Sequence, residues 1–273
     1  TSGSGQEATV EVAHEKIFTA RPKLKVWIDK SGDDLRLIDY AEEAATRRHE
    51  TNCDLRDLLR EEKTEAIHQA LMRLNKTPSA RLYSFLNQQQ MMVDKLQNAS
   101  LSHQDRLLIG QRLAVVGDRR PGVGLRKTDG LPDLDWIKIP GGQVQFEDKL
   151  VLKVKVFKVK PFLITKYPVT NIQFNTFISA SDGYQNREWW EGTTRSHEAA
   201  QPRWQDCNAP RELVSWYEAV AFCRWLSFRT KLAIRLPTES EWLQAATGGN
   251  PRRKYPWEGR WSGLRCNSGE SGL

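Results

Sequence analysis

The chain has 273 residues, a net charge of +7, an isoelectric point near 9.2 and a mean hydropathy of -0.62. This length suffices for two domains of ordinary size, and the sequence holds no apolar run long enough to form a membrane-spanning helix. Its cysteines, Cys53, Cys207, Cys223 and Cys266, lack the short paired spacings of a zinc site. We therefore expect a cytoplasmic protein with reduced thiols.

Residues 1–118 show the pattern of short amphipathic helices. Ser102 with Asp105 is typical of a helix start, Pro78 interrupts the pattern, and Gly117 is typical of a helix end. We expect a helical bundle or array packed through its apolar positions. These positions recur at helical spacing: Leu35, Ile38, Ala41 and Ala45; Leu55, Leu58, Leu59, Ile67, Leu71 and Leu74; then Leu82, Phe85 and Leu86.

Residues 119–135 are rich in proline and glycine and show no periodicity, which predicts a linker between two domains. Its GVGLRKTDG stretch is glycine-rich but precedes no helical pattern. No phosphate-binding loop of the form GxxxxGK[ST] occurs in the chain, so the chain itself is not expected to be a nucleotide-hydrolysing enzyme.

The second domain, 136–273, is predicted to begin with strands. Residues 136–139 form an apolar run that ends at the turn Pro140-Gly141-Gly142. The stretch LVLKVKVFKVKPFLI, at 150–164, alternates between apolar and basic for several residues, with Val154 and Val156 separated by lysine. This predicts an antiparallel strand with one buried and one solvated face, ended by Pro161.

Three capping boxes predict three helix starts in this domain. The helix after Ser215 carries Trp216, Val220, Cys223 and Leu226 on one stripe, and we expect that stripe to face a core. The remaining apolar positions and caps are Thr170 with Gln173, Phe174, Phe177 and Ile178; Ser215 with Glu218; and Thr238 with Glu241, Trp242, Ala245 and the stop Gly248.

Two connecting segments carry further expectations. LAIRLP, at 232–237, is short, apolar and closed by proline, which favours a strand. The segment 181–210 is aromatic and polar without a period, and loops of this length are functional or packed on themselves. We expect Trp189 and Trp190 to be buried and to hold this loop in place.

Several of these stretches, in this order, resemble the formylglycine-generating enzyme/sulfatase-modifying factor family. They are WIKIPGGQ, FLITKYPVTNIQFNTFI, the pair Trp189-Trp190, VSWYEAVAFCRWLS, RLPTESEWLQAATGG and YPWEG. The resemblance implies an α+β fold in which the helical region precedes a variant C-type lectin domain at 136–273. Within 1–118, two stretches resemble the helical regions that accompany STAND-type signalling ATPases in bacteria.

The resemblance also bears on activity. Formylglycine-generating enzymes oxidise a sulfatase cysteine with copper held by two thiolates near the end of their domain, and no cysteine here matches those positions. The family pattern stops mid-domain, so we expect the natural protein to continue beyond Leu273. The related sulfoxide synthases need an HxxxHxE set, whereas His14, His49, His68 and His103 never show that spacing.

Calcium is the one metal that the resemblance suggests for this chain. Family members bind calcium through oxygen ligands, as a hard cation requires, and one such site begins with an Asn shortly after the YPW motif. Asn267 stands at that place. A turn or capping role is the simpler interpretation of an Asn in CNSGESG.

Basic residues cluster at Arg252, Arg253 and Lys254 beside Tyr255 and Trp257. Elsewhere lysine and arginine alternate with acids, as on solvated helix faces, so a nucleic-acid partner is not expected. The sequence favours a non-catalytic module that binds a protein or small ligand, such as the variable receptor of a bacterial diversity-generating retroelement. The alternatives are a formylglycine-generating oxidase and a sensor domain of a STAND ATPase.

Overall fold

The computed structural model describes residues 22–50, 59, 61–148, 153–194, 198–250 and 252–270. Its contacts divide the chain into two compact units, residues 1–88 and 89–273. This division lies upstream of the linker predicted at 119–135. Predicted positions Leu55 and Leu58, and Cys53, lie outside the described residues.

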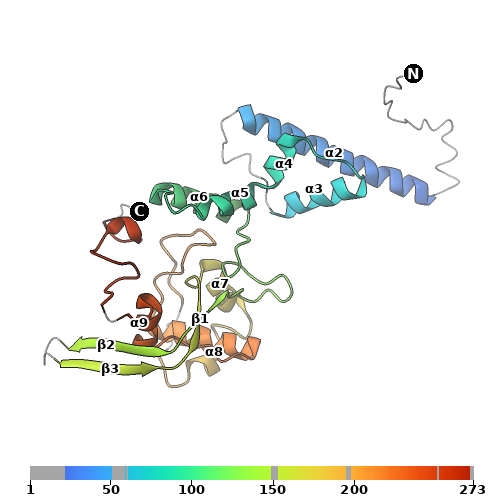
Figure 1. Cartoon of the computed structure of the whole chain (residues 1–273). Helices are drawn as coiled ribbons and strands as arrows, with labels where there is room; N and C mark the ends of the chain where they lie inside the picture. Colours follow the sequence, from blue (N-terminus) through green and yellow to red (C-terminus); the bar gives the residue numbers. More distant parts are fainter. Residues whose placement is uncertain are drawn as a thin grey trace. The chain divides into compact units, whose positions relative to one another are not determined.

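The first unit is helical (Figure 1). Its helices are α2 (Pro22–Glu50), α3 (Glu61–Arg73) and α4 (Ala80–Leu86). Their buried apolar side chains form one cluster that includes Ile38, Ile67 and Leu82. Leu35 was predicted to share this stripe but is 43% exposed. The predicted Ile38, Ala41 and Ala45 are buried, and Ala44 joins them in the cluster.

Polar contacts also join the helices of this unit. The Arg73 guanidinium donates two hydrogen bonds to the Asp34 carboxylate, at 2.8 and 2.6 Å. This bidentate pair lowers the pKa of Asp34, mainly through the hydrogen bond from Arg73. Ser79 caps α4 and also donates from its hydroxyl to Glu42 of α2 at 2.5 Å. The helical part of 1–118 is thus confirmed over the described residues.

The second unit begins with α5 (Gln88–Leu96) and α6 (His103–Val116), followed by a small mixed body. Ser102 accepts from the Asp105 N–H and Gly117 ends α6, as predicted. The body contains β1 (Trp136–Ile139), β2 (Gly142–Asp148), β3 (Lys153–Val159), β4 (Phe162–Thr165), α7 (Asn171–Ser179), α8 (Trp216–Thr230) and α9 (Glu239–Thr247), with short 3-10 turns η2 (Arg187–Trp190) and η3 (Gly263–Arg265).

The strands form two separate antiparallel pairs, β1 with β4 and β2 with β3. The β2–β3 hairpin projects from the body and packs on α9 near its base (Figure 1). Val154 and Val156, predicted to face a core, are 55% and 54% exposed. They stand opposite Glu147 and Gln145, so their face is the solvated one.

The apolar pattern of β3 changes face after Val156. Phe157 and Val159 stand opposite Val144 and Gly142, on the other side of the hairpin, and Val144 and Val159 are buried. Because successive side chains of a strand alternate between faces, a shift of one residue decides which set is covered. The predicted strand is confirmed, and its predicted buried face is wrong.

The core of the second unit lies between α7, α8 and the loop after α7. It is strongly aromatic, and its members contact one another in tilted and edge-to-face geometries. Trp189 and Trp190 are 8% and 5% exposed, and their indole N–H groups donate to Asp182 O and Tyr184 O at 2.6 and 2.9 Å. The predicted role of these two residues in holding the loop is confirmed.

All three predicted helix starts are present. Ser215 and Glu218 exchange both bonds of a capping box, as do Thr238 and Glu241. At α7, the Gln173 carboxamide accepts from the Thr170 N–H at 3.0 Å. These devices join residues three apart in sequence, which is why sequence alone locates them.

The predicted stripes on α8 and α9 are partly wrong. Trp216 is 63% exposed and Trp242 is 60% exposed. On α8 the buried side runs instead through Ala221, Phe222 and Trp225, together with the predicted Cys223 and Leu226. On α9 it is Gln244 that is buried, and its carboxamide donates to Pro140 O at 3.1 Å.

Candidate functional site

An apolar groove lies between β4 and the segment 232–237, with α8 as its floor. We call it the β4–α8 groove; it encloses about 550 Å³, within the range of ligand-binding clefts. It is lined by Leu134, Trp136, Phe162, Leu163, Ile164, Thr165, Val169, Phe222, Cys223, Leu226, Leu232, Ala233, Ile234, Arg235, Leu236, Pro237 and Glu241.

Both rims of the groove are extended backbone. Within the described part of the chain, β4 pairs with β1 alone, so its other edge has no neighbouring strand. The segment 232–237, predicted as a strand, is an extended loop. Ile234 exchanges hydrogen bonds with the Ser227 hydroxyl of α8, at 2.9 and 2.8 Å, in place of a strand ladder.

The charged groups of the groove neutralise each other. The Arg235 guanidinium donates two hydrogen bonds to the Glu241 carboxylate, at 2.7 and 2.6 Å. That contact, with a smaller contribution from the Thr238 cap, lowers the pKa of Glu241 to about 2. The lining of the groove is therefore apolar apart from one ion pair, whose two charges neutralise each other.

This pair predicts a pH dependence of stability. Because the folded-state pKa of Glu241 lies below its ordinary 4.5, the stabilisation is fully present above that value and is lost as pH falls toward about 2. We expect the difference in free energy of unfolding between wild type and Glu241→Gln to be constant near neutral pH and to shrink in acid. Urea denaturation across this pH range measures it.

The exposed neighbour Glu239 provides the control for that measurement. Glu239→Gln removes a carboxylate from the same first turn of α9 and leaves the Arg235 contact intact. If the difference in free energy of unfolding between wild type and Glu241→Gln stayed unchanged down to the lowest pH, the lowered pKa of Glu241 would be contradicted.

Cys223 is the thiol that lines the groove. It is 9% exposed, and burial raises its pKa to about 11. Cys207 donates to Ala114 O of α6 at 3.4 Å, and burial raises its pKa as well. Both therefore favour the neutral thiol at neutral pH, whereas metal binding and nucleophilic attack need the thiolate.

The predicted calcium ligand Asn267 lies in an exposed loop directly after η3. Among the described residues, no group of three or more His, Cys, Asp or Glu side chains could hold a metal ion. The structure thus places no carboxylate cluster in that part of the chain. A calcium role for Asn267 stays a prediction.

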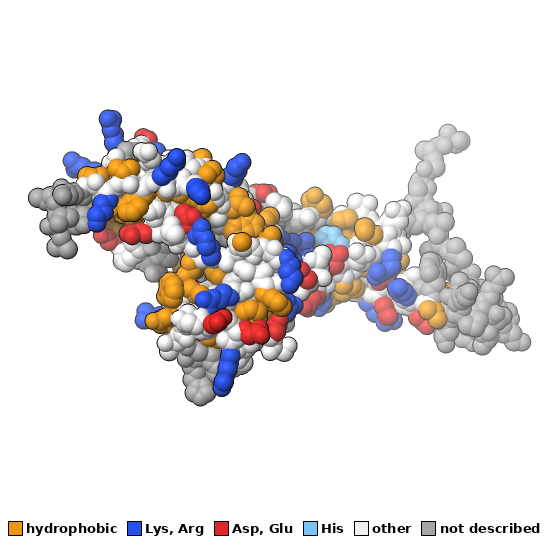
Figure 2. Space-filling view, turned by 90° about the horizontal axis from the view of Figure 1, so that it is seen from below, with side chains coloured by type: hydrophobic (Ala, Val, Ile, Leu, Met, Phe, Trp, Pro, Cys, Tyr) orange, Lys and Arg blue, Asp and Glu red, His pale blue; other side chains and the backbone are white. Residues whose placement is uncertain are grey.

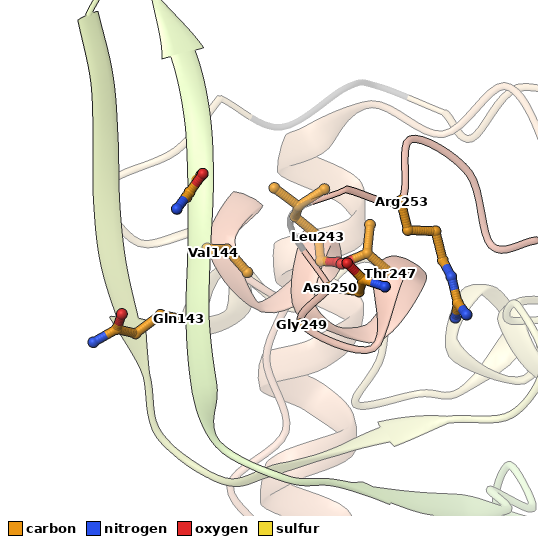
Figure 3. Close-up of a pocket in the computed structure, with 8 residues that line it drawn as sticks. Gln143, Val144, Leu243, Thr247, Gly249, Asn250 and Arg253 are labelled. Atoms are coloured by element: carbon orange, nitrogen blue, oxygen red, sulfur yellow. The ribbon is translucent and has the colours of Figure 1, made fainter. Parts of the chain in front are cut away.

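A second, smaller hollow of about 40 Å³ lies between β2 and the end of α9 (Figure 3). Gln143 and Val144 line it from the strand, and Leu243, Thr247 and Asn250 from the helix end. This volume holds little more than ordered water, so the hollow is a packing feature at the base of the hairpin.

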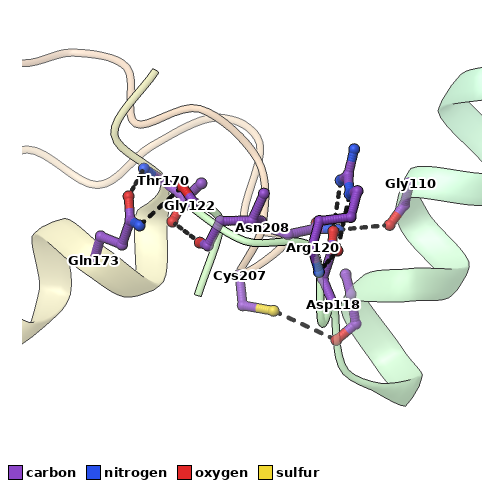
Figure 4. Close-up of polar contacts among 10 residues, drawn as sticks. Gly110, Asp118, Arg120, Gly122, Thr170, Gln173, Cys207 and Asn208 are labelled. Carbon is purple, nitrogen blue, oxygen red and sulfur yellow. Dashed lines mark hydrogen bonds and ion pairs between the residues drawn. The ribbon is translucent and has the colours of Figure 1, made fainter. Parts of the chain in front are cut away.

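A network of polar contacts supports the body beside α6 (Figure 4). The Asn208 amide donates to Gly110 O at 2.9 Å and to Asp118 at 2.8 Å, while Arg120 binds the same Asp118 carboxylate at 2.5 Å. Hydrogen bonds from Arg120 and Asn208 outweigh burial and lower the pKa of Asp118. The loop that carries Asn208 is thereby tied to α6.

The segment 119–135, predicted as a linker, is held by α7. The Gln173 amide donates to the carbonyls of Gly122, Gly124 and Asp133, at 3.2, 3.1 and 2.6 Å, and Thr170 donates to Val123 O at 2.8 Å. Gly122 has φ +85°, and a Cβ there would lie 2.7 Å from that of Asp135. The glycine is required at this close approach.

With this geometry established, comparison with known proteins identifies the domain. Residues 126–271 match the family model described as the sulfatase-modifying factor enzyme 1-like domain. The chain belongs to this family. The matched residues include both rims and the floor of the β4–α8 groove.

Curated relatives of this sulfatase-modifying factor family member include enzymes and an inactive homologue. The formylglycine-generating enzyme of Thermomonospora curvata is 31% identical over 137 aligned positions, covering 38% of this chain and 43% of the relative. The formylglycine-generating enzyme of Streptomyces coelicolor is 27% identical over 200 aligned positions, covering 56% of this chain and 59% of the relative. The inactive C-alpha-formylglycine-generating enzyme 2 of Bos taurus is 29% identical over 174 aligned positions, covering 49% of this chain and 56% of the relative.

The chain thus spans about half the length of the curated relatives that it matches. No described helix is both long and apolar enough to cross a membrane. The β4–α8 groove was not foreseen from sequence, because its walls come from segments that are far apart along the chain. The apolar run 232–237 and the α8 positions Cys223 and Leu226 were noticed in the sequence, but the run was assigned to a strand and the α8 positions to the core.

Proposed function

We propose that this chain is a non-catalytic binding module of the sulfatase-modifying factor family, built on a C-type-lectin-like scaffold. The observation that carries the proposal is the β4–α8 groove, with its apolar lining and about 550 Å³ of space. The ligand class that fits is an extended apolar polypeptide of a partner protein. Two extended rims would flank it, and strand addition to the edge of β4 would supply main-chain hydrogen bonds.

The environments of two of the three described cysteines support a non-catalytic role. Cys223 in the groove wall is buried, with a pKa near 11, and Cys207 is bound to a carbonyl of α6. The Bos taurus relative is named an inactive formylglycine-generating enzyme, which supports a non-catalytic role for this chain. A variable receptor of a bacterial diversity-generating retroelement, joined to a STAND-associated helical region, is the biological setting that we propose.

The alternative is a formylglycine-generating oxidase, which the Thermomonospora curvata and Streptomyces coelicolor relatives favour. Incubation with copper(I) and a sulfatase-derived cysteine peptide, followed by mass spectrometry, distinguishes the two. Conversion of the peptide cysteine to an aldehyde would overturn the non-catalytic proposal.

Binding in the groove is tested by a substitution on its rim. Leu163 is 57% exposed and lines the groove. We expect a capped peptide of alternating valine and threonine to shift the methyl NMR signals of Ile164 and Ile234. Leu163→Asp should weaken this binding about tenfold or more, because burying one leucine contributes about 1.5–3 kcal/mol and the carboxylate would be desolvated.

Ile137 provides the matched control on the paired strand. It is 40% exposed and does not line the groove. Ile137→Asp should leave peptide binding unchanged, and both variants should keep the wild-type near-ultraviolet circular dichroism. Equal loss of binding in the two variants, or methyl shifts confined to residues outside the groove, would refute this site.

A further inference from the structure

The loop after α9, residues 252–270, gathers aromatic rings and cations on one short stretch. The rings of Tyr255 and Trp257 are stacked, with centroids 5.3 Å apart and an interplanar angle of 14°. Trp261 contacts both, at 5.4 and 5.8 Å between centroids, and is itself 43% exposed. We call these three residues the aromatic stack.

The polar edges of the two indoles are already bonded within the loop. The Trp257 N–H donates to Arg260 O at 3.1 Å, and the Trp261 N–H donates to the Glu270 carboxylate at 2.7 Å. These contacts fix the orientation of the rings. Trp261 is exposed, whereas Tyr255 and Trp257 are half-buried and cover one face of each other. The ring surface left for a ligand is therefore mainly that of Trp261, and ring faces recognise planar or apolar groups with little hydrogen-bond specificity.

The charge around the aromatic stack is strongly one-sided. Residues 252–270 contain five Arg or Lys and two Glu. Glu258 binds Arg253 at 3.1 Å, and Glu270 is engaged by Trp261. The other four cations are exposed, and among the described residues no ion pair involves them: Arg252, Lys254, Arg260 and Arg265.

A ligand that matches both features has flat rings at regular intervals and a negative charge on each unit. We propose that the aromatic stack and its cations bind single-stranded nucleic acid, with bases on the ring faces and phosphates beside the arginines and lysine. The sequence did not favour a nucleic-acid partner because cations and acids alternate elsewhere in the chain. Figure 2 shows the same mixture, with Lys and Arg side chains spread over that face among acidic and hydrophobic ones. The folded loop differs because it places the exposed ring of Trp261 among four exposed cations, while Glu258 is paired with Arg253.

Fluorescence anisotropy of a labelled oligothymidylate, titrated with the full chain at several salt concentrations, tests this proposal. If about three phosphates are neutralised, the logarithm of the association constant should fall with the logarithm of salt concentration with a slope of about -2. Arg252→Ala or Arg260→Ala should each make that slope about 0.7 less steep. Lys158→Ala, which removes an exposed cation from β3, should leave it unchanged.

Base stacking is tested separately from charge. Trp261→Ala should weaken binding about tenfold or more, since one stacked base contributes an amount of that order, whereas Trp261→Phe should retain most of the affinity because a ring remains. Trp204→Ala removes a tryptophan that is 54% exposed at another site and should have no effect. Absence of binding at low salt would overturn the proposal, as would equal affinity for a sulfated polysaccharide that is insensitive to Trp261→Ala.

Discussion

Replacing Trp225 with alanine is expected to lower the free energy of unfolding of the second unit by about 3–5 kcal/mol. Trp225 is fully buried and lies among Phe177 and Phe222, at ring-centroid distances of 5.4 and 6.0 Å. Its indole also donates to the Asp182 carboxylate at 3.3 Å. The substitution removes a large apolar contact, leaves a cavity in a rigid aromatic core and takes a donor from Asp182.

Trp242→Ala is the matched control, because Trp242 is also a helical tryptophan of this unit but is 60% exposed. We expect it to change the free energy of unfolding by less than about 1 kcal/mol. Chemical denaturation monitored by far-ultraviolet circular dichroism measures both variants. Similar losses for Trp225→Ala and Trp242→Ala would show that the core is not centred on α8.

Gln173→Leu is expected to destabilise the same unit by about 3 kcal/mol or more, although leucine is similar in size and more apolar. Gln173 is completely buried, and its amide binds three backbone carbonyls while its carbonyl accepts from Thr170. Leucine would leave these buried groups without partners, at about 1–3 kcal/mol for each group that water does not reach.

The exposed Gln145 on β2 provides the control for that substitution. Gln145→Leu should change stability by about 0.5 kcal/mol or less. Hydrogen exchange adds a local measurement, since Gln173→Leu should accelerate exchange of the Val123 and Asp133 amides, whose segment Gln173 holds. A Gln173→Leu protein as stable as wild type would show that the carbonyls find other partners.

Features set by nearby residues could be predicted from sequence. The caps at Ser102, Ser215 and Thr238 and the stop at Gly248 depend on contacts within a few residues. The end of β1 at Ile139, before Pro140, was also predicted correctly. Trp189 and Trp190 were predicted correctly because their positions follow a family pattern, not because of any periodicity.

Features that depend on distant partners could not be predicted. Trp216 and Trp242 belong to plausible apolar stripes, yet neighbouring stripes on the same helices are the ones that other elements cover. The same choice between faces decided which side of β3 is buried. Gln173 was recognised as a capping residue, but its three contacts with the segment 119–135 required the folded backbone.

The β4–α8 groove could also be predicted only in part, because several distant segments form it. Its floor on α8 was predicted in part through Cys223 and Leu226, whereas its width depends on where β4 and the segment 232–237 lie. The aromatic stack is an intermediate case. Its residues are close in sequence and were noticed there, but an irregular loop gives no periodicity from which ring contacts could be inferred.

The contacts of α6 determine where this protein can be divided. From composition, one would place the domain boundary near Asp118. However, the Asp118 carboxylate is bound by Arg120 and Asn208. The Cys207 thiol and the Asn208 amide also donate to backbone carbonyls of α6. Gln89 of α5 likewise donates to Val116 O. A fragment starting at residue 119 would expose the surface beneath α6 and lose the carboxylate that binds Asn208. For expression of the second unit alone, the natural starting point precedes α5.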